Sequence, residues 1–364
     1  MKIALYSPFL DENLGGGERY LLTIAEHLSQ QHRVDLFLRL GTKDKKDFLK
    51  KYALKLNLDL SKVNLMEKGF IKLSFWQRLK QTRDYDAFLY LTDGSFFFSL
   101  AKKNIVHFQI PFPQKPKGLI NKIKLNNWSV RIANSFFTKT VLEKRWGIKI
   151  HFIHRCGPDL NVYKPLKKKK IILNVGRFFS PLGFKHCKRQ DFLVATFKKM
   201  CHEGLKGWQL IFDGSIDKGK DNWDYAQKVI KIAKGFPIII RHDSSFSQLR
   251  KDYGEALIYW HATGLGIDEE KHPEAVEHLG LSTIEAMASQ AIPVVINKGG
   301  QKEIVDNGKN GFLWVDQQGL IKYSLKLIKD IRLRKRLAKN AREKAKNFSK
   351  QKFNQTTEKI FGLK

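Results

Sequence analysis

The chain has 364 residues, of which 42% are hydrophobic and 12% aromatic, so it supplies packed interiors but is too long for one ordinary core. Its 67 Lys and Arg against 35 Asp and Glu give a formal net charge of +32, which attracts polyanions such as nucleic acid, anionic lipid headgroups or phosphorylated substrates. A Lys-rich genome would produce the same excess, so charge alone selects no partner, and no apolar segment is long enough to span a bilayer.

The first residues, "MKIALYSPFL", enter an apolar strand directly and lack the long apolar region and small-residue cleavage site of a secretory signal. Three scattered cysteines, Cys156, Cys187 and Cys201, have neither metal-ligand spacing nor the even number of a disulfide set. These two features predict a protein of the reducing cytoplasm.

Short apolar runs alternate with amphipathic stretches along the whole chain. The predicted strands are 2–7, 34–38, 87–91, 104–108 and 130–134 in the first half, and 170–176, 208–214, 236–241, 256–260, 291–296 and 311–315 in the second. Amphipathic stretches such as 17–31 and 191–204 predict helices between them. Continuous apolar strands alternating with helices indicate parallel sheets covered on both faces.

The strand and helix pattern runs twice, with a break at "RCGPDLNVYKPLKKKK" (155–170) whose Gly, two Pro and Lys run predict a surface linker. We therefore expect two doubly wound α/β domains, 1–157 and 158–340, with ligands bound at the carboxyl ends of the strands. The basic segment 341–364 predicts C-terminal helices that can pack back on the first domain.

Two loops have residues suited to anions. Gly15 and Gly16, in "LGGGERY", precede a helix whose free amides can face an anion, although a flexible loop explains them equally well. Arg177 follows a strand directly, and Lys188 lies at the start of the next helix. A guanidinium fork and an ammonium at one strand end suit a diphosphate, but a chance pair is common in so basic a chain.

The stretch "EAVEHLGLSTIEAMA" places Glu277 and Glu285 on either side of a predicted helix start at Gly280. Ser282 and Glu285 match a capping box, which would explain the second acid as helix chemistry. Alternatively, the two carboxylates hold sugar and ribose hydroxyls while the amides of the first helical turn hold phosphate.

These motifs resemble, in order and spacing, those of family-4 glycosyltransferases, most closely members with an EHFG-type Glu-x7-Glu signature. The likeness covers nearly the whole chain. It rests on "GGGERY", "IANSFFTKTVLEKRWG" (132–147), "VGR" with the later Lys, "EHLGLSTIEAMA", "GGQKEIVDNGKNGFLW" (299–314) and "NAREKAKNFS" (340–349). The resemblance implies the GT-B architecture, in which two Rossmann-like domains face each other across a cleft.

The resemblance also implies roles for individual residues. Arg177 and Lys188 would bind the donor diphosphate, Glu285 the nucleotide ribose, and Glu277 would face the transferred sugar. The remaining donor-side positions are Gly176, His278, Leu279, Gly280 and Leu281, of which the last three would offer amides to the distal phosphate.

In the first domain, which would bind the acceptor, His107 matches a histidine that points toward the sugar in family members. A core or capping histidine is its alternative reading. Gly15 and Gly16 would line the acceptor side of the cleft.

The implied activity is transfer of a hexosyl group, of mannose or glucose type, from a GDP- or UDP-linked donor to a lipid-linked or glycan acceptor with retention. No permanently bound cofactor and no essential metal are expected, since "DYD" (84–86) lies before a first-domain strand and is interpreted as a turn. The alternatives are a GT-B phosphorylase or epimerase, or a basic nucleic-acid-binding protein, for which no recognition module is present.

Two basic segments with apolar interruptions, 70–83 and 113–128, predict contact with an anionic membrane surface, and their alternative is core-facing helices with solvated lysines. Three positions depart from the family pattern: Leu279 replaces Phe, and Arg189 and Gln290 stand where glycine is common. The segment 261–273 has no predicted role.

Overall fold

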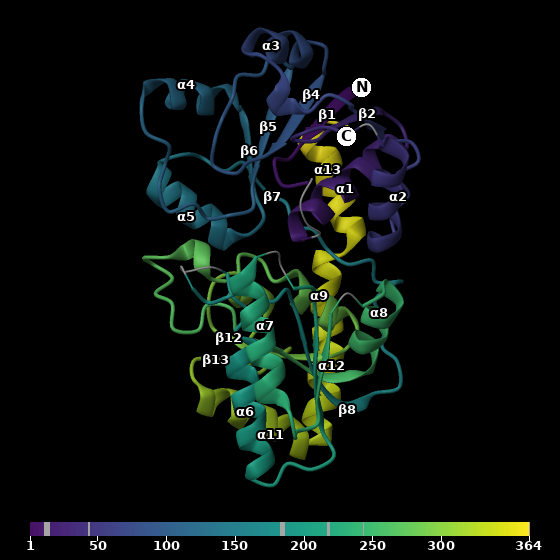
Figure 1. Ribbon diagram of the computed structural model, residues 1–364, viewed down its shortest axis with the longest axis vertical. Coiled ribbons are helices and arrows are strands. Elements are labelled where there is room, and N and C mark those ends of the chain that lie inside the picture. Colours follow the sequence, from purple (N-terminus) through teal and green to yellow (C-terminus); the bar gives the residue numbers. More distant parts are fainter. Residues whose placement is uncertain (11–14, 43, 183–185, 217–218, 243, 364) are drawn as a thin grey trace. The chain divides into compact units, whose positions relative to one another are not determined.

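The computed structural model describes residues 1–10, 15–42, 44–182, 186–216, 219–242 and 244–363. Contacts divide the chain into two compact units (Figure 1): unit 1 comprises Met1–Cys156 and Phe353–Lys364, and unit 2 comprises Gly157–Lys352. Unit 2 is therefore inserted into unit 1. Of the predicted loops, residues 11–14 and 183–185 lie outside the described residues.

Unit 1 contains a parallel sheet in the order β3-β2-β1-β4-β5-β6-β7. Its strands are β1 (Lys2–Tyr6), β2 (Arg33–Phe37), β3 (Asn64–Leu65), β4 (Ala87–Leu91), β5 (Lys103–Phe108), β6 (Val130–Ala133) and β7 (Phe152–Ile153). The central strands β1 and β4 are buried along most or all of their length, which is why their sequences are continuous apolar runs.

Among the described residues of unit 1, six helical segments connect these strands. Aromatic rings fill one face of the sheet. The segments are α1 (Gly16–Ser29), α2 (Lys45–Leu56), η1 (Phe70–Lys72), α3 (Phe75–Arg83), α4 (Leu119–Asn127) and α5 (Phe136–Trp146). Phe88 from β4 packs edge-on against Trp128 with ring centroids 6.0 Å apart, and Phe97 packs against the same indole at 5.0 Å.

The last helix, α13 (Lys350–Phe361), begins in unit 2 and continues into unit 1. Phe353 stacks on the ring of His154 with centroids 4.2 Å apart, and it also meets the ring of Tyr20 edge-on at 5.5 Å. The end of the chain thus supplies part of the buried interior of unit 1.

Unit 2 contains a second parallel sheet, in the order β10-β9-β8-β11-β12-β13. Its strands are β8 (Lys169–Val175), β9 (Gln209–Asp213), β10 (Ile238–Arg241), β11 (Ala256–His261), β12 (Ile292–Ile296) and β13 (Phe312–Trp314). Its helices are α6 (Gln190–His202), α7 (Lys220–Ala233), α8 (Phe246–Glu255), η2 (Pro273–Ala275), α9 (Leu281–Ala288), α10 (Gln301–Ile304), α11 (Gln317–Lys329), α12 (Ile331–Ala345) and η3 (Lys346–Phe348).

Helices cover both faces of this sheet. On one face Ile258 of β11 packs in a cluster with residues of α6, α7 and α11, whereas its neighbour Tyr259 belongs to a second cluster with residues of α8, α9 and α12. Because successive strand residues point to opposite faces, this division shows that β11 is a central strand with no solvent face.

The expected α/β fold with two parallel-sheet domains is confirmed, and every predicted strand overlaps an observed one. The strands β3 and β7 were not predicted, because two-residue edge strands carry no apolar run. Among the described residues, no helix combines the length and apolar character needed to cross a membrane.

Candidate functional site

The candidate site of unit 2 lies where β8 and β11 end. Gly176 follows β8 and packs against the methylene chain of Lys188, so closely that a Cβ on the glycine would lie 2.8 Å from Cγ of the lysine. The side-chain amide of Gln190 donates to the carbonyls of Gly176 (3.3 Å) and Arg177 (3.2 Å). The guanidinium of Arg177 lies over the ring of Phe179 at 4.5 Å. The loop after β8 and the start of α6 are thereby held together.

Lys188 and Glu277 form an ion pair at this site. The ammonium lies 2.7 Å from Oε2 of Glu277, and both side chains are almost buried, with 12% and 11% exposed. Burial opposes the charge of Glu277, but Lys188 and the neighbouring histidines outweigh it and hold the pKa of this carboxyl well below its usual range. The two residues predicted for diphosphate and sugar thus occupy one charge network.

His261, the last residue of β11, is the second partner of Glu277. Its Nε2 lies 2.8 Å from Oε2 of the glutamate, and the side chain is fully buried. Its Nδ1 has no hydrogen-bond partner within the described part of the chain. A proton on Nδ1 would be a buried donor without an acceptor, so the neutral ring with its proton on Nε2, donated to Glu277, is the favoured form. Burial also lowers the pKa of His261.

His186 completes the network on the other carboxylate oxygen. Its Nε2 lies 3.7 Å from Oε1 of Glu277, and its ring packs against that of His278 with centroids 4.9 Å apart. Burial, and next the ammonium of Lys188, lower the pKa of His186 to about 3. His278 in turn has its Nε2 3.0 Å from the carbonyl of Glu274. Sequence reasoning missed both His186 and His261, although one lies two residues before the predicted lysine.

The helix α9 begins beside this network. Gly280 precedes it with φ +95°, a conformation that favours glycine, and its carbonyl accepts from the amides of Thr283 (3.0 Å) and Ile284 (3.1 Å). The amides of Leu281 and Ser282 come before these bonds, in the first turn where helix amides are available to an anion. The predicted arrangement of a glycine followed by outward first-turn amides is consistent with this geometry.

The capping-box interpretation of Ser282 and Glu285 is wrong. The residue that precedes the helix is Gly280, and no side chain caps it. The hydroxyl of Ser282 lies inside the helix and accepts from Tyr259 at 2.7 Å, while the phenol of Tyr253 donates to Oε2 of Glu285 at 2.8 Å. Glu285 is therefore placed by a buried tyrosine, which leaves its ligand-binding role as a prediction.

The backbone of Glu277, His278 and Leu279 packs against the glycine pair at the end of β12. The amide of Gly300 donates to the carbonyl of Glu277 at 2.7 Å, and a Cβ at Gly300 would lie 2.4 Å from the carbonyl oxygen of His278. Leu279 itself is buried in the cluster with α9. Close backbone contact explains why two glycines precede α10.

The segment 261–273, which had no predicted role, contacts the turn that packs against this loop. Glu269 accepts from the amide of Gly299 at 2.7 Å and pairs with Lys302 at 2.5 Å, and the ammonium of Lys298 donates to the carbonyl of Ile267. These contacts tie the segment to the turn after β12. Through this turn, whose Gly300 donates to the carbonyl of Glu277, Glu269 supports the loop that carries Glu277.

Both positions where the family commonly has glycine are left-handed here. Arg189 has φ +54° and Gln290 has φ +60°. After α9, the amide of Ala291 bonds the carbonyl of Ala286 and that of Gln290 bonds the carbonyl of Met287, the pattern of a Schellman motif that favours glycine at its left-handed position.

The predicted residues of unit 1 are described by themselves. The amide of Gly15 donates to the side chain of Glu18 at 2.7 Å, and nothing lies within 4 Å of a Cβ built on Gly16. His107 is fully buried and stacks on the ring of Tyr20 with centroids 3.9 Å apart. Burial lowers its pKa well below the usual range, so the ring is neutral. This environment is that of a core histidine, and contact with a sugar stays a prediction.

In the "DYD" segment, Asp84 follows the end of α3, and Asp86 lies just before β4. The carboxylate of Asp86 accepts from the amide of Lys2 at 2.8 Å and pairs with Lys102 at 2.8 Å. Both acids therefore belong to the turn that leads into the strand.

A family model described as "Glycosyl transferases group 1" matches residues 159–344, just over half of the chain. A search of curated proteins found no match. Among solved structures, HepE of Anabaena in complex with UDP is 18% identical, with a TM-score of 0.73 and 100% of each chain covered.

Two further solved structures show the same likeness. A glycosyltransferase from Rickettsia africae is 19% identical, with a TM-score of 0.73 and coverage of 99% of this chain and 97% of that one. Sucrose-phosphate synthase from Thermosynechococcus elongatus is 17% identical, with a TM-score of 0.71 and coverage of 100% and 98%. Such likeness, with the two parallel sheets, shows a two-domain GT-B fold.

Proposed function

The chain belongs to the glycosyl transferases group 1, and on that premise we propose that it is a hexosyltransferase using a nucleotide diphosphate sugar. A group of mannose or glucose type moves to a lipid-linked or glycan acceptor with retention of anomeric configuration. The observation that carries the proposal is the buried pair of Lys188 and Glu277, which lies beside the loop of Arg177.

The donor site of this proposal is built from unit 2. Arg177, Lys188 and the first-turn amides of α9 offer positive charge to the diphosphate, and Glu285 offers a carboxylate to the ribose. The Anabaena HepE structures are complexes of that protein with UDP and with UDP-glucose, which supports a nucleotide-sugar donor here. The base, uracil or guanine, is identified by which nucleoside diphosphate stabilises the protein in the thermal-shift experiment.

In the proposed reaction, the acceptor hydroxyl oxygen forms a bond to C1 of the sugar while the bond from C1 to the diphosphate oxygen breaks. The hydroxyl proton passes to the departing phosphate, so that no protein base is required. The cations of Arg177 and Lys188 stabilise the charge that develops on the diphosphate, the contribution that usually dominates in such preorganised sites. Glu277 faces the sugar, and the bond from His261 fixes its carboxylate.

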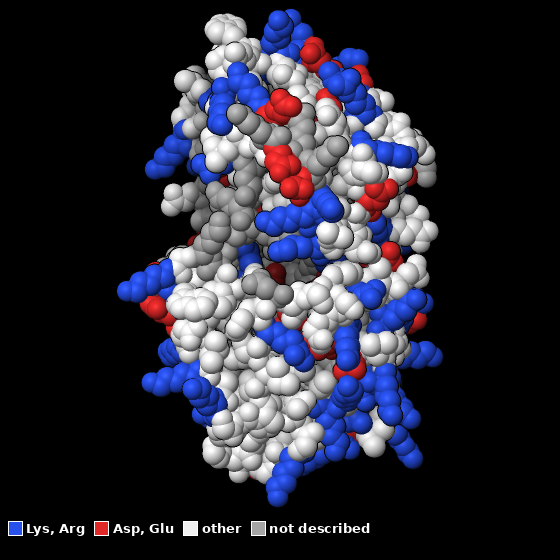
Figure 2. All heavy atoms as spheres, turned by 45° about the vertical axis from the view of Figure 1, so that its right-hand side comes forward, with Lys and Arg blue, Asp and Glu red and all other residues white. Residues whose placement is uncertain are grey.

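Peripheral binding to an anionic membrane forms part of the proposal, and α4 of unit 1 supports it. Leu119, Ile120 and Ile123 are 72%, 65% and 49% exposed, although they are apolar. Lysines 115, 117, 122 and 124 accompany them. On the face of the protein drawn in Figure 2, Lys and Arg are more widespread than Asp and Glu. An exposed apolar strip flanked by lysines fits an anionic bilayer interface.

The membrane part is tested by flotation with phosphatidylglycerol vesicles and with phosphatidylcholine vesicles. We expect binding only to the anionic vesicles, lost at high salt and in the double variant Ile120→Ser with Ile123→Ser. Equal binding of that variant would contradict this part of the proposal.

The donor site is tested by thermal shift with GDP, UDP and ADP, followed by product analysis with a labelled nucleotide sugar. We expect one nucleoside diphosphate to raise the melting temperature, because a ligand that binds only the folded state stabilises it. The shift should vanish in Lys188→Met and persist in Lys206→Met, a change on the exposed surface of unit 2. Absence of any shift with all three nucleotides would contradict the proposal. Release of sugar phosphate from a glycan supplied with inorganic phosphate, without transfer from any nucleotide sugar, would identify a phosphorylase.

A further inference from the structure

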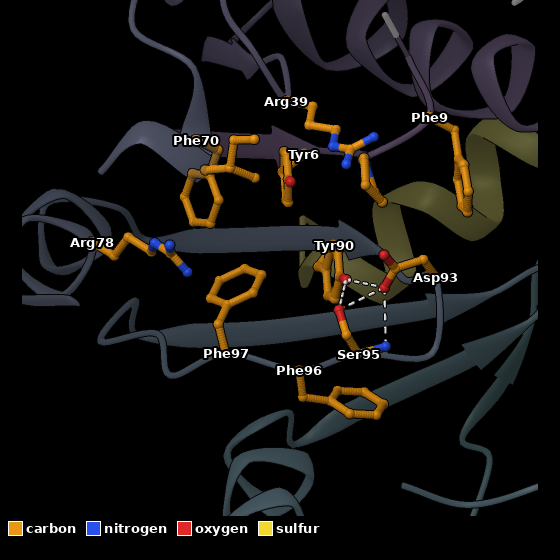
Figure 3. Close-up of a pocket in the computed structure, with 12 residues that line it drawn as sticks. Tyr6, Phe9, Arg39, Phe70, Arg78, Tyr90, Asp93, Ser95, Phe96 and Phe97 are labelled. Atoms are coloured by element: carbon orange, nitrogen blue, oxygen red, sulfur yellow. Dashed lines mark hydrogen bonds between the residues drawn. The ribbon is translucent and has the colours of Figure 1, made fainter. Parts of the chain in front are cut away.

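Unit 1 contains a pocket of its own, at the ends of β1 and β4 (Figure 3), with a volume of about 310 Å³. Aromatic side chains form much of its wall: Tyr6 and Tyr90 stack with centroids 5.5 Å apart, and Phe97 lies 4.9 Å from Tyr90. In open parallel sheets, this edge is where ligands bind. An apolar wall with few polar groups is the usual composition of a ligand site.

The charged groups of the pocket are two guanidinium groups, from Arg39 and Arg78, and one carboxylate, from Asp93. The carboxylate is already engaged, since it accepts from the hydroxyl (2.6 Å) and amide (3.0 Å) of Ser95 and from the phenol of Tyr90 (3.0 Å). Burial opposes its charge, but these hydrogen bonds outweigh burial and lower the pKa of Asp93. No ion pair joins it to Arg78 within the described residues.

Two contacts hold the side chain of Arg78 in place. Its Nε donates to the carbonyl of Leu73 at 3.0 Å, and the guanidinium lies 5.7 Å from the centre of the Phe70 ring. Its two terminal nitrogens make no hydrogen bond to any described residue. Figure 3 shows them directed from α3 into the space between Phe70 and Phe97. A fixed guanidinium with free terminal N–H groups suits an anion with two oxygens.

Exposed apolar residues continue from this pocket along the same segment. Ile71, which lines the pocket, is 43% exposed, and Phe75 and Trp76 of α3 are 52% and 76% exposed. The rings of Phe75 and Trp76 pack against each other with centroids 5.1 Å apart. Ring pairs that remain in water offer a surface to an apolar chain.

We propose that this pocket binds the anionic headgroup of an amphipathic acceptor, a phosphate on an apolar chain, with the chain lying along Phe75 and Trp76. Arg78 binds the headgroup oxygens, and the aromatic wall excludes water around them. The assignment as acceptor rests on the proposed glycosyltransferase function, whereas the binding of an amphipathic phosphate does not depend on it. The alternative is that Arg78 only covers the ring of Phe70. In that case neither an anion nor the exposed rings of Phe75 and Trp76 would be needed to explain its position.

The experiment measures binding of dodecyl phosphate, below its micellar concentration, by isothermal titration calorimetry on the full chain. Inorganic phosphate and dodecanol are the matched probes for headgroup and chain. We expect dodecyl phosphate to bind at least about tenfold more tightly than either, because both halves of the site then contribute. Equal binding of inorganic phosphate would show a simple anion site, and equal binding of dodecanol a simple apolar surface; either result would overturn the proposal.

Variants separate the two halves. Arg78→Gln should weaken dodecyl phosphate binding by about 10- to 100-fold, the usual loss for a hydrogen bond to a charged group, and Arg78→Lys should retain part of it. Trp76→Ser should weaken it while leaving inorganic phosphate unaffected. Lys55→Gln, which removes an exposed charge from α2, is the control and should change nothing. Unchanged binding in Arg78→Gln, with circular dichroism showing a folded protein, would overturn the proposal.

The two proposals fail independently. If nucleoside diphosphate binds the wild type but not Lys188→Met, and dodecyl phosphate does not bind, the donor-site proposal stands and the pocket proposal is overturned. If dodecyl phosphate binds in a way that depends on Arg78 and no nucleotide binds, the pocket proposal stands and the donor-site proposal is overturned.

Discussion

The ammonium of Lys188 lies 2.7 Å from Oε2 of Glu277, so the cation expected to bind the diphosphate is neutralised by the acid expected to face the sugar. A donor that takes up Lys188 must compete with this carboxylate. Once the ammonium moves to the diphosphate, Glu277 keeps only its histidine partners, of which His261 makes the close contact. In the proposed reaction, the pair would therefore couple diphosphate binding to the state of the acid beside the sugar.

Glu277→Gln is therefore expected to bind nucleoside diphosphate more tightly while transferring sugar more slowly. Removing the competing charge frees Lys188, and the gain should be about tenfold in affinity, the scale of one hydrogen bond to a charged group. Calorimetry with UDP and GDP, together with transfer rates, measures both effects. Glu203→Gln, a change on the exposed end of α6, should alter neither. Weaker nucleotide binding in Glu277→Gln would contradict the competition.

His261→Phe is expected to lower kcat for transfer by about tenfold or more, with a smaller change in KM for the donor. The variant keeps the buried ring but removes the N–H that fixes Glu277, and misplacing a group near the reacting atoms carries such losses. His261→Gln, whose amide can reach the position of Nε2, should recover part of kcat. Steady-state kinetics of the folded variants provide the measurement. Equal kcat for all three proteins would reduce His261 to a structural role.

Asp213→Asn is expected to stabilise the protein at pH 8 but not at pH 4. Burial, with the carboxylate of Asp252 nearby, raises the pKa of Asp213 to about 6. A carboxyl whose pKa is raised on folding contributes stability below its unfolded value, and that contribution is lost as the pH rises through about 6. The wild type should lose about 2 kcal/mol over this window, and the variant should not.

Urea denaturation at the two pH values provides the measurement for this variant. Asp224→Asn, an exposed carboxylate of α7, is its control and should show the wild-type pH dependence. A stability difference between Asp213→Asn and wild type that is the same at both pH values would contradict the raised pKa.

Gln290→Gly is expected to raise the free energy of unfolding by about 1 kcal/mol or slightly less. The residue has φ +60° at the end of α9, where a side chain is strained and glycine is not. Gln290→Ala keeps a Cβ and should give no such gain, so it is the matched control. Chemical denaturation of both variants decides the matter, and equal stabilities would show that the strain is absent.

Sequence patterns predicted the two sheets because buried parallel strands are continuous apolar runs, as in β4 and β12. They also predicted that the regions of Arg177, Lys188 and Glu277 lie at one end of a sheet, because these residues follow or face strand ends. What they missed depends on contacts between distant segments. The ring of His261 meets Glu277 only because β11 ends beside the loop before α9, and Ser282 bonds Tyr259 rather than the helix start.

Residues 261–273 illustrate the same limit. Their acidic composition is typical of an exposed loop, and only the fold brings Glu269 to Gly299 and Lys302, about thirty positions later. For His107, by contrast, the alternative of a core histidine was available from the sequence, and its stacking on Tyr20 matches that alternative.

The course of α13 affects how the protein is made. Phe353 covers His154 and meets Tyr20, yet it lies about two hundred residues after the histidine along the chain. A ribosome that has synthesised all of unit 1 up to Cys156 has therefore not yet produced the ring that closes over this histidine. The buried interior of unit 1 therefore stays incomplete during translation until α13 has been synthesised, which happens only after unit 2.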